Sequence, residues 1–144
     1  MNIYQRRSAS QYGKVAVRSE VNYASSHRLV QMLMEGALEK IAIAKGHMAR
    51  KEYEQKGQHV NWAISIISGL QGSLNLTEGG ELAANLNALY DYMVRRLSEA
   101  NLHNDISLLD EVTSLLTEIK AGWDAIPDEV KKPQTLSTKP VSAA

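Results

Sequence analysis

The sequence predicts an all-α fold, an antiparallel four-helix bundle. The three prolines all lie at or after Pro127, and a proline inside a helix costs about 3 kcal/mol. Apolar residues recur at intervals of three and four along four long segments, which is the period of an amphipathic helix. The connections between these segments are short, and short connections favour antiparallel neighbours. Phe is absent, so the core must consist of aliphatic side chains, which suits the packing of helices against one another.

The first helix is predicted to begin after Ser25 and to reach about Arg50. The Ser25 hydroxyl can accept a hydrogen bond from the free N–H groups of a first turn. The apolar stripe of this helix comprises Leu29, Leu33, Ala37, Ile41, Ala44 and Met48. The second helix is predicted from about Glu52 to Leu74, and its stripe comprises Tyr53, Val60, Ile64, Ile67 and Leu74.

The third helix is predicted to follow the glycine pair Gly79 and Gly80, and to reach residue 100. These glycines can take the left-handed conformations that end one helix and turn the chain. The stripe of the third helix comprises Leu82, Leu86, Leu89, Met93 and Leu97. Asn104 or Asp105 is predicted to cap the fourth helix, which Pro127 stops. Its stripe comprises Ile106, Leu109, Val112, Leu116, Ile119 and Trp123.

The two ends of the chain differ in composition from the bundle. Residues 1–24 are predicted to form a basic N-terminal arm that is mobile or contains one short helix. Residues 25–126 form the predicted helical bundle. Residues 127–144 contain Pro, Lys, Ser and Thr with almost no large apolar group. Such a segment cannot bury enough surface to offset its ordering entropy, so we expect a disordered tail.

Charge and hydropathy limit the classes of function. Sixteen Lys and Arg residues balance sixteen Asp and Glu residues, which argues against a nucleic-acid partner because such binding depends on a basic surface. No apolar run approaches the roughly 20 residues that span a bilayer, so we expect no membrane insertion. The N-terminus lacks the apolar region of a secretory signal. Together with the absence of cysteine, these features lead us to expect a cytoplasmic protein.

The sequence shows no constellation of residues for catalysis or for a cofactor. None of the four histidines, at positions 27, 47, 59 and 103, has an acidic residue three positions before it, so the Glu-x-x-His pattern of di-iron bundles is missing. No His-Glu-x-x-His motif and no glycine-rich phosphate loop occur. We therefore expect a protein that is not an enzyme, with no cofactor and no metal, and with solvated or partly packed histidines.

The third helix carries a surface that suits a peptide partner. Tyr90 and Tyr92 lie about 200° apart around a helix, so at least one of them must be exposed or lie in a groove. Arg95 and Arg96 either hold a carboxylate of a partner or pair with Glu99, one turn further on; the sequence leaves both alternatives open. An apolar seam left open between helices suits the binding of a helix in a groove.

Two segments resemble a known family. GGELAANLNALYDYMVRRLSEANLHNDISLLDEVTSLLTEIKAGWDAI resembles the second half of the flagellin-specific export chaperones, the FliS family. VNYASSHRLVQMLMEGALEKI resembles the opening helix of that family more loosely. The resemblance covers roughly residues 10–126. Ser26 stands where the family commonly has Pro, and Met34 and Glu35 stand where it commonly has Tyr-Asp.

The resemblance implies a cytoplasmic export chaperone without enzymatic activity. Such a chaperone binds the disordered C-terminal segment of flagellin, prevents premature polymerisation and delivers the subunit to the flagellar export gate. In the family the N-terminal arm can cover part of the binding groove. The residues that we predict to contact the peptide are Tyr4, Tyr12, Met34, Ile64, Ile67, Tyr90, Tyr92, Met93, Arg96 and Leu97. The alternative is a self-associating structural bundle that serves another client; a homodimer of the free protein would be compatible with either function.

Overall fold

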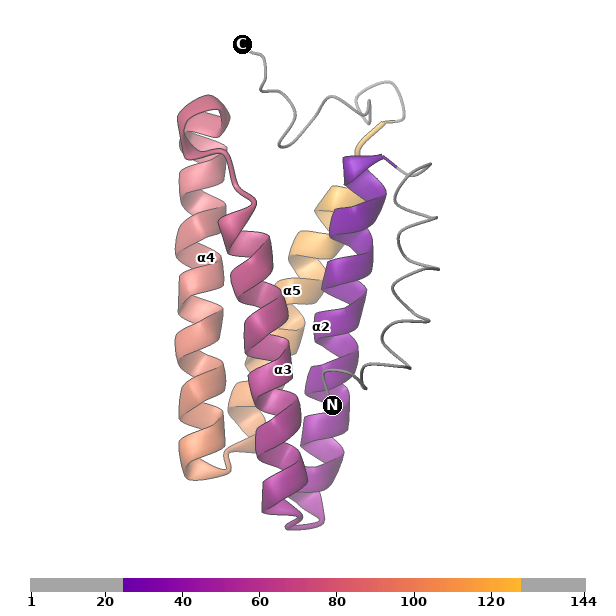
Figure 1. The fold of residues 1–144 in the computed structure, drawn as a ribbon, viewed down its shortest axis with the longest axis vertical. Coiled ribbons are helices and arrows are strands. Elements are labelled where there is room, and N and C mark those ends of the chain that lie inside the picture. The colour runs from indigo at the N-terminus through magenta and orange to yellow at the C-terminus, as the bar shows by residue number, and fades with distance from the viewer. Residues whose placement is uncertain (1–24, 128–144) are drawn as a thin grey trace, which may run out of the picture.

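A computed structural model describes residues 25–127 as four helices. They are α2 (Ser26–Ala49), α3 (Tyr53–Gly72), α4 (Leu76–His103) and α5 (Ile106–Asp124). Each helix runs antiparallel to the one before it (Figure 1), and no strand occurs within these residues. The predicted all-α four-helix bundle is therefore confirmed. The predicted arm (1–24) and all of the predicted tail (127–144) except Pro127 lie outside the described residues.

The four helices form a closed ring in which each one packs against two others. Helix α2 contacts α3 and α5, and α4 contacts the same two helices from the opposite side. At one end of the bundle lie the connections from α2 to α3 and from α4 to α5. The other end holds the α3–α4 connection, the beginning of α2 and the end of α5 (Figure 1). We call this second end the α3–α4 end.

Side-chain caps begin three of the helices. The Ser25 hydroxyl accepts a hydrogen bond from the Arg28 amide at 3.3 Å, and the Asp105 carboxylate accepts one from the Ser107 amide at 3.0 Å. Both caps agree with the sequence-based prediction. The Asn75 side chain accepts a hydrogen bond from the Glu78 amide at 2.9 Å. This third cap was not predicted, and it places the start of α4 before the glycine pair.

Gly80 bends α4 after its first turn. Its φ of 58° and ψ of −136° are non-helical, and a side chain would strain this backbone conformation. Gly79, in contrast, belongs to the first turn, and its amide donates to the Asn75 carbonyl at 2.7 Å. The prediction that both glycines separate two helices is therefore wrong. Of these two glycines, only Gly80 takes a positive φ, and it redirects the rest of α4.

The core follows the predicted periodicity except near the ends of the helices. In the first half of α2 the buried apolar residues include Val30 and Met34, whereas the predicted Leu29 and Leu33 are only partly buried. One position corresponds to about 100° around a helix, so the buried face at the beginning of α2 is rotated by about that angle from the predicted face. The buried hydrophobic cluster comprises Val30, Met34, Ala37, Ile41, Ala44, Met48, Val60, Ala63, Ile67, Leu70, Tyr90, Met93, Leu97, Ala100, Leu108, Leu109, Val112 and Leu116.

Two further residues on the predicted stripes lie on the surface, and one lysine lies inside. The exposed fractions of Tyr53 and Leu82 are 46% and 69%, so their assignment to the core was wrong. Lys56 is only 6% exposed. Its Nζ donates to the backbone carbonyl of Asn101 at 2.9 Å and to the side-chain oxygen of Asn101 at 2.6 Å, and burial lowers its pKa. This contact joins α3 to α4 at the end far from the α3–α4 connection.

Candidate functional site: an apolar cavity at the α3–α4 end

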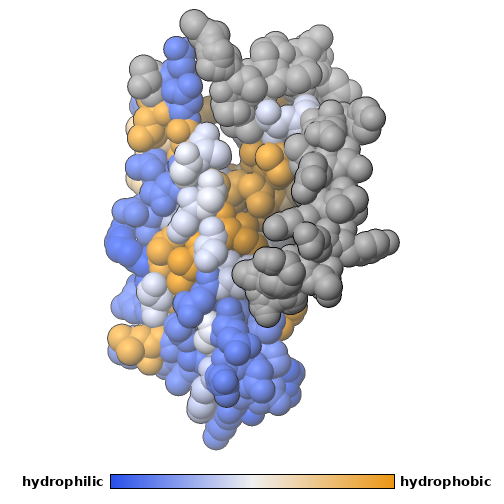
Figure 2. All heavy atoms as spheres, in the orientation of Figure 1, coloured by the Kyte–Doolittle hydropathy of each residue, from blue (hydrophilic) through white to orange (hydrophobic). Residues whose placement is uncertain are grey.

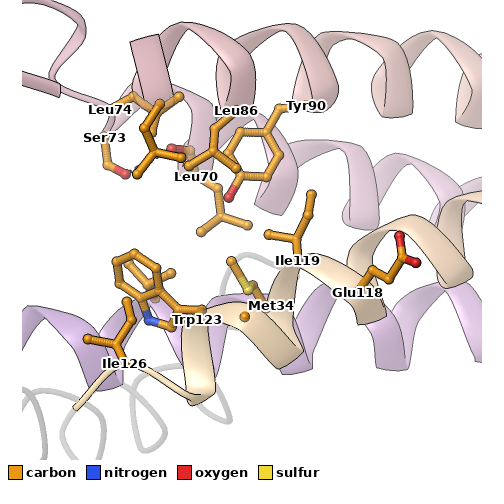
Figure 3. Close-up of a pocket in the computed structure, with 13 residues that line it drawn as sticks. Met34, Leu70, Ser73, Leu74, Leu86, Tyr90, Glu118, Ile119, Trp123 and Ile126 are labelled. Atoms are coloured by element: carbon orange, nitrogen blue, oxygen red, sulfur yellow. Dashed lines mark hydrogen bonds between the residues drawn. The ribbon is translucent and has the colours of Figure 1, made fainter. Parts of the chain in front are cut away.

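A cavity of about 400 Å³ lies between the four helices at the α3–α4 end. Figure 3 shows its walls, to which all four helices contribute. The lining is predominantly apolar, and Glu118, which is exposed, is the one charged residue in it. The lining residues are Val30, Met34, Leu70, Ser73, Leu74, Leu82, Leu86, Tyr90, Glu118, Ile119, Gly122, Trp123 and Ile126. A cavity of this size and character suits apolar side chains.

The first half of α4 leaves part of this lining exposed. Leu82 is 69% exposed, and Leu86 is only partly buried. Both follow Gly80, where the helix changes direction. On the face shown in Figure 2, apolar side chains gather mainly in the upper and middle parts, toward the α3–α4 end, whereas the lower part is mostly hydrophilic. An exposed apolar surface beside an apolar cavity is typical of an interaction site.

A polar network holds α5 to α2 beside the cavity. Lys120 Nζ lies 2.7 Å from the Asp124 carboxylate, which also accepts a hydrogen bond from the Gln31 side chain at 2.7 Å. The hydrogen bond from Lys120 is the main cause that lowers the pKa of Asp124, and the bond from Gln31 adds to it. The adjacent His27 is 5% exposed; the prediction of a solvated or partly packed side chain was wrong for this histidine.

The two tyrosines of α4 lie in different environments, as their spacing predicted. Tyr90 is 2% exposed and lines the cavity, and burial raises its pKa. Tyr92 is half-buried on the other side of the helix and donates a hydrogen bond to Glu111 Oε2 on α5 at 2.5 Å. That bond is also the largest cause that lowers the pKa of Glu111.

Arg96 belongs to the same polar cluster as Tyr92. Its Nε donates to Glu111 Oε1 at 3.0 Å, and its Nη1 donates to Glu99 Oε1 at 2.8 Å. Pairing with Glu99 was one of the two alternatives that the sequence left open. Arg95 is exposed, with its guanidinium carbon 5.7 Å from the centre of the Tyr92 ring.

The structure distributes the residues predicted to contact a peptide over three environments. Met34 and Tyr90 line the cavity. Ile67, Met93 and Leu97 are fully buried in the core, and Ile64 is partly buried against it. Tyr92 and Arg96 belong to the polar cluster with Glu111. Tyr4 and Tyr12 lie outside the described residues.

Sequence reasoning missed several residues of the cavity. Leu82, Leu86, Ile119 and Trp123 were assigned to helix stripes and not to a site. One signal in the sequence could have found them. The predicted stripe of α5 continues to Trp123, and Ile126 follows just after the helix, well beyond Leu116, the last fully buried residue of α5. An apolar stripe that extends beyond the packed core indicates a surface that another segment covers.

Neither a metal cluster nor a membrane span is found within the part of the chain that the structure describes. No group of three or more His, Cys, Asp or Glu residues in 25–127 could hold a metal ion. None of the four described helices is both long and apolar enough to cross a membrane. The apolar cavity at the α3–α4 end is the candidate functional site that we describe for these residues.

The sequence matches a family model described as flagellar protein FliS over residues 8–130. The chain belongs to the FliS family. This agrees with the resemblance in its second half. Several FliS proteins are similar to this chain along most of their own length. The chain is 49% identical to flagellar secretion chaperone FliSB of Pseudomonas aeruginosa, over 86% of this chain and 98% of the relative.

Two other FliS proteins are similar to this chain over a comparable share of the sequence. The flagellar secretion chaperone FliS of Vibrio cholerae is 42% identical over 86% of this chain and 91% of its own length. That of Salmonella typhimurium is 40% identical over 86% and 93%, respectively. These FliS proteins are named as chaperones and not as enzymes. Membership in the family thus supports an export-chaperone role in the flagellar system and confirms the prediction of a non-enzymatic protein.

Proposed function

We propose that this FliS-family chain is a cytoplasmic export chaperone for flagellin. It binds the disordered C-terminal segment of flagellin, prevents premature polymerisation and delivers the subunit to the flagellar export gate. The observation that carries the proposal is the apolar cavity at the α3–α4 end, to which all four helices contribute. Family membership supports the chaperone role, and the cavity supplies a site for the apolar side chains of a client.

The geometry suits a client that folds when it binds. Ordering such a segment costs roughly 2–5 kcal/mol or more of the gross interaction energy, so the segment must bury a large surface. The part of α4 that follows the bend at Gly80, residues 81–103, is about 35 Å long. A helical client that lies along α4 and places apolar side chains beside Leu82 and Leu86, and into the cavity, would bury such a surface.

The remaining predicted contacts belong to the same proposal. Residues 1–24 form an arm that covers the groove through Tyr4 and Tyr12 until a client displaces it, residues 25–126 form the binding domain, and residues 127–144 form a tail outside it. Tyr92 and Arg96 would contact polar groups of the client at the α4–α5 surface. Of the predicted residues, Ile67, Met93 and Leu97 are fully buried in the structure. They would act indirectly, by supporting the groove from within the core, with Ile64 at the margin of the groove.

A calorimetric titration with the C-terminal segment of the host's flagellin tests the proposal. We expect a one-to-one complex with a large negative heat-capacity change, because coupled folding buries apolar surface. Absence of binding at micromolar concentration would contradict it. Sedimentation of the free protein tests the alternative, a self-associating bundle that serves another client. A homodimer that flagellin dissociates would agree with the chaperone function, whereas a homodimer that persists with flagellin present would favour the alternative.

A further inference from the structure

The hydroxyl of Tyr90 is a polar group inside the apolar cavity. The residue is 2% exposed, and Figure 3 shows its hydroxyl directed from α4 into the cavity, toward Leu70. Within residues 25–127 this hydroxyl makes no hydrogen bond, and its oxygen is not fully buried but faces the open cavity. Two other polar groups of the lining are paired: the Ser73 hydroxyl donates to the Leu70 carbonyl at 2.8 Å, and the Trp123 indole donates to the His27 carbonyl at 3.0 Å.

An occupant that fills the cavity excludes water from this hydroxyl, and a hydroxyl that is then buried without a partner is unfavourable. Phe at the same position would fill the same space without that penalty. Tyr92, two positions further on, shows the usual arrangement, since its hydroxyl is paired with Glu111. Burial raises the pKa of Tyr90. The Tyr90 hydroxyl therefore keeps its proton at neutral pH and is available as a hydrogen-bond donor.

We infer that the Tyr90 hydroxyl determines specificity in the cavity by donating a hydrogen bond to a neutral side-chain oxygen of the bound segment. This inference rests on the proposed function. The bound segment would carry one Asn, Gln, Ser or Thr among the apolar residues that enter the cavity. A site that is built to bond such a group discriminates strongly against an analogue that lacks it, because its own polar atom is then left unpaired.

The surroundings of Tyr90 favour a neutral partner from a side chain. The carbonyl oxygens inside a helical client are already bonded within its helix. A carboxylate would lose its hydration in an apolar cavity and would also approach Glu118, the acidic residue of the lining. A neutral amide or hydroxyl oxygen of a side chain carries no charge that would have to be dehydrated and is not repelled by Glu118.

The test compares Tyr90→Phe with the native protein in a calorimetric titration with the flagellin C-terminal segment. We expect binding to weaken about five- to tenfold, the effect of one buried hydrogen bond, while the melting temperature stays equal or rises. Tyr53→Phe is the matched control, because Tyr53 is 46% exposed at the other end of the bundle. It should leave the affinity unchanged. Equal or tighter binding of the native segment by Tyr90→Phe would overturn the inference.

Variants of the client identify the partner atom. Each neutral polar residue of the segment is replaced by Ala in turn, and each variant is titrated against both proteins. One replacement should weaken binding to the native protein but not to Tyr90→Phe. If every replacement has the same effect on both proteins, the hydroxyl has no such partner and the inference fails.

Leu86→Ala distinguishes failure of this inference from failure of the proposed function. Leu86 lines the cavity and is partly buried, so its truncation should weaken client binding whether or not Tyr90 donates a hydrogen bond. Circular dichroism confirms that the variant is folded. If Leu86→Ala weakens binding and Tyr90→Phe does not, only the inference is overturned. If neither variant changes the affinity, the client does not use the cavity and the proposed site fails with it.

Discussion

The indole ring of Trp123 lies parallel to the imidazole ring of His27, with 4.9 Å between the ring centroids and 8° between the planes. The Trp123 indole N–H also donates to the backbone carbonyl of His27 at 3.0 Å, across 96 positions of sequence. These contacts join the end of α5 to the first turn of α2. Because Trp123 also lines the cavity, they fix one of its walls.

The hydrogen bond of Trp123 should contribute measurably to stability. Trp123→Phe retains an aromatic ring but removes the indole N–H, and it should lower the free energy of unfolding by about 1 kcal/mol. Urea unfolding followed by circular dichroism measures the change. Trp62→Phe is the control, because Trp62 is 49% exposed and should change stability by less than about 0.5 kcal/mol. Equal losses in the two variants would show that the bond to His27 is not important for stability.

Two exposed leucines at opposite ends of α4 provide a matched test of where the client binds. Leu82 is 69% exposed beside the cavity, and Leu102 is 74% exposed near the far end. Leu82→Gln should weaken binding of the flagellin segment roughly ten- to a hundredfold, since burying a leucine contributes about 1.5–3 kcal/mol. Leu102→Gln should leave the affinity unchanged in the same calorimetric titration. A larger loss in Leu102→Gln would place the client at the other end of the bundle.

The backbone conformation of Gly80 should make it intolerant of substitution. Gly80→Ala has space for the new methyl group, because nothing lies within 4 Å of a Cβ atom there. It should nevertheless lower the free energy of unfolding by about 1–3 kcal/mol, owing to backbone strain at a φ of 58°. Thermal and urea unfolding measure this change.

Gly69 provides the opposite control. It is exposed within α3, and a Cβ atom would also meet nothing within 4 Å. Gly69→Ala should therefore raise the free energy of unfolding by about 0.5–1 kcal/mol, because Ala favours a helix over Gly. Destabilisation by both substitutions to a similar degree would contradict the assignment of backbone strain to Gly80 alone.

The cluster of Tyr92, Arg96 and Glu111 should contribute to the pH dependence of stability. Hydrogen bonds from Tyr92 and then Arg96 lower the pKa of Glu111 in the folded state. In the unfolded state this pKa is about 4.3. The resulting stabilisation is thus fully present above about pH 4.3 and is lost as the pH falls through the lower pKa of the folded state.

Glu111→Gln tests this dependence. The variant should be less stable than the native protein at pH 6, and the difference should shrink as the pH falls below about 4.3. Urea unfolding at a series of pH values measures both effects. Glu118→Gln, which changes an exposed acidic residue on the same helix, is the control and should show a smaller difference. A difference for Glu111→Gln that stays constant down to pH 3 would show that ionisation of this carboxylate is not involved.

Much of the fold could be predicted from local sequence. The caps at Ser25 and Asp105 depend on side chains that bond amides two or three positions away. The helices follow from periodicity, and the opposite settings of Tyr90 and Tyr92 follow from helix geometry. Local patterns were sufficient for these features because every group involved lies within one or two helical turns.

The candidate site was predicted only in part. Tyr90 and Met34 were included among the peptide contacts, but Ile119 and Trp123 were read as core residues. An apolar stripe shows which side of a helix is apolar. It does not show how closely the neighbouring helix approaches at each position along the helix axis. The cavity exists because the four apolar stripes do not close completely at the α3–α4 end, and this depends on all four helices at once.

By itself, the sequence determined the helices, most of their stripes and a close resemblance to a family. The tertiary structure decided the bend at Gly80, the burial of Lys56 and His27, and the presence of an open apolar cavity between the ends of all four helices. The physical reason is the distance in sequence between the residues that interact. Helix formation is governed by bonds between residues three or four positions apart, whereas burial depends on contacts such as that between His27 and Trp123, which are distant in sequence and adjacent only in the folded bundle.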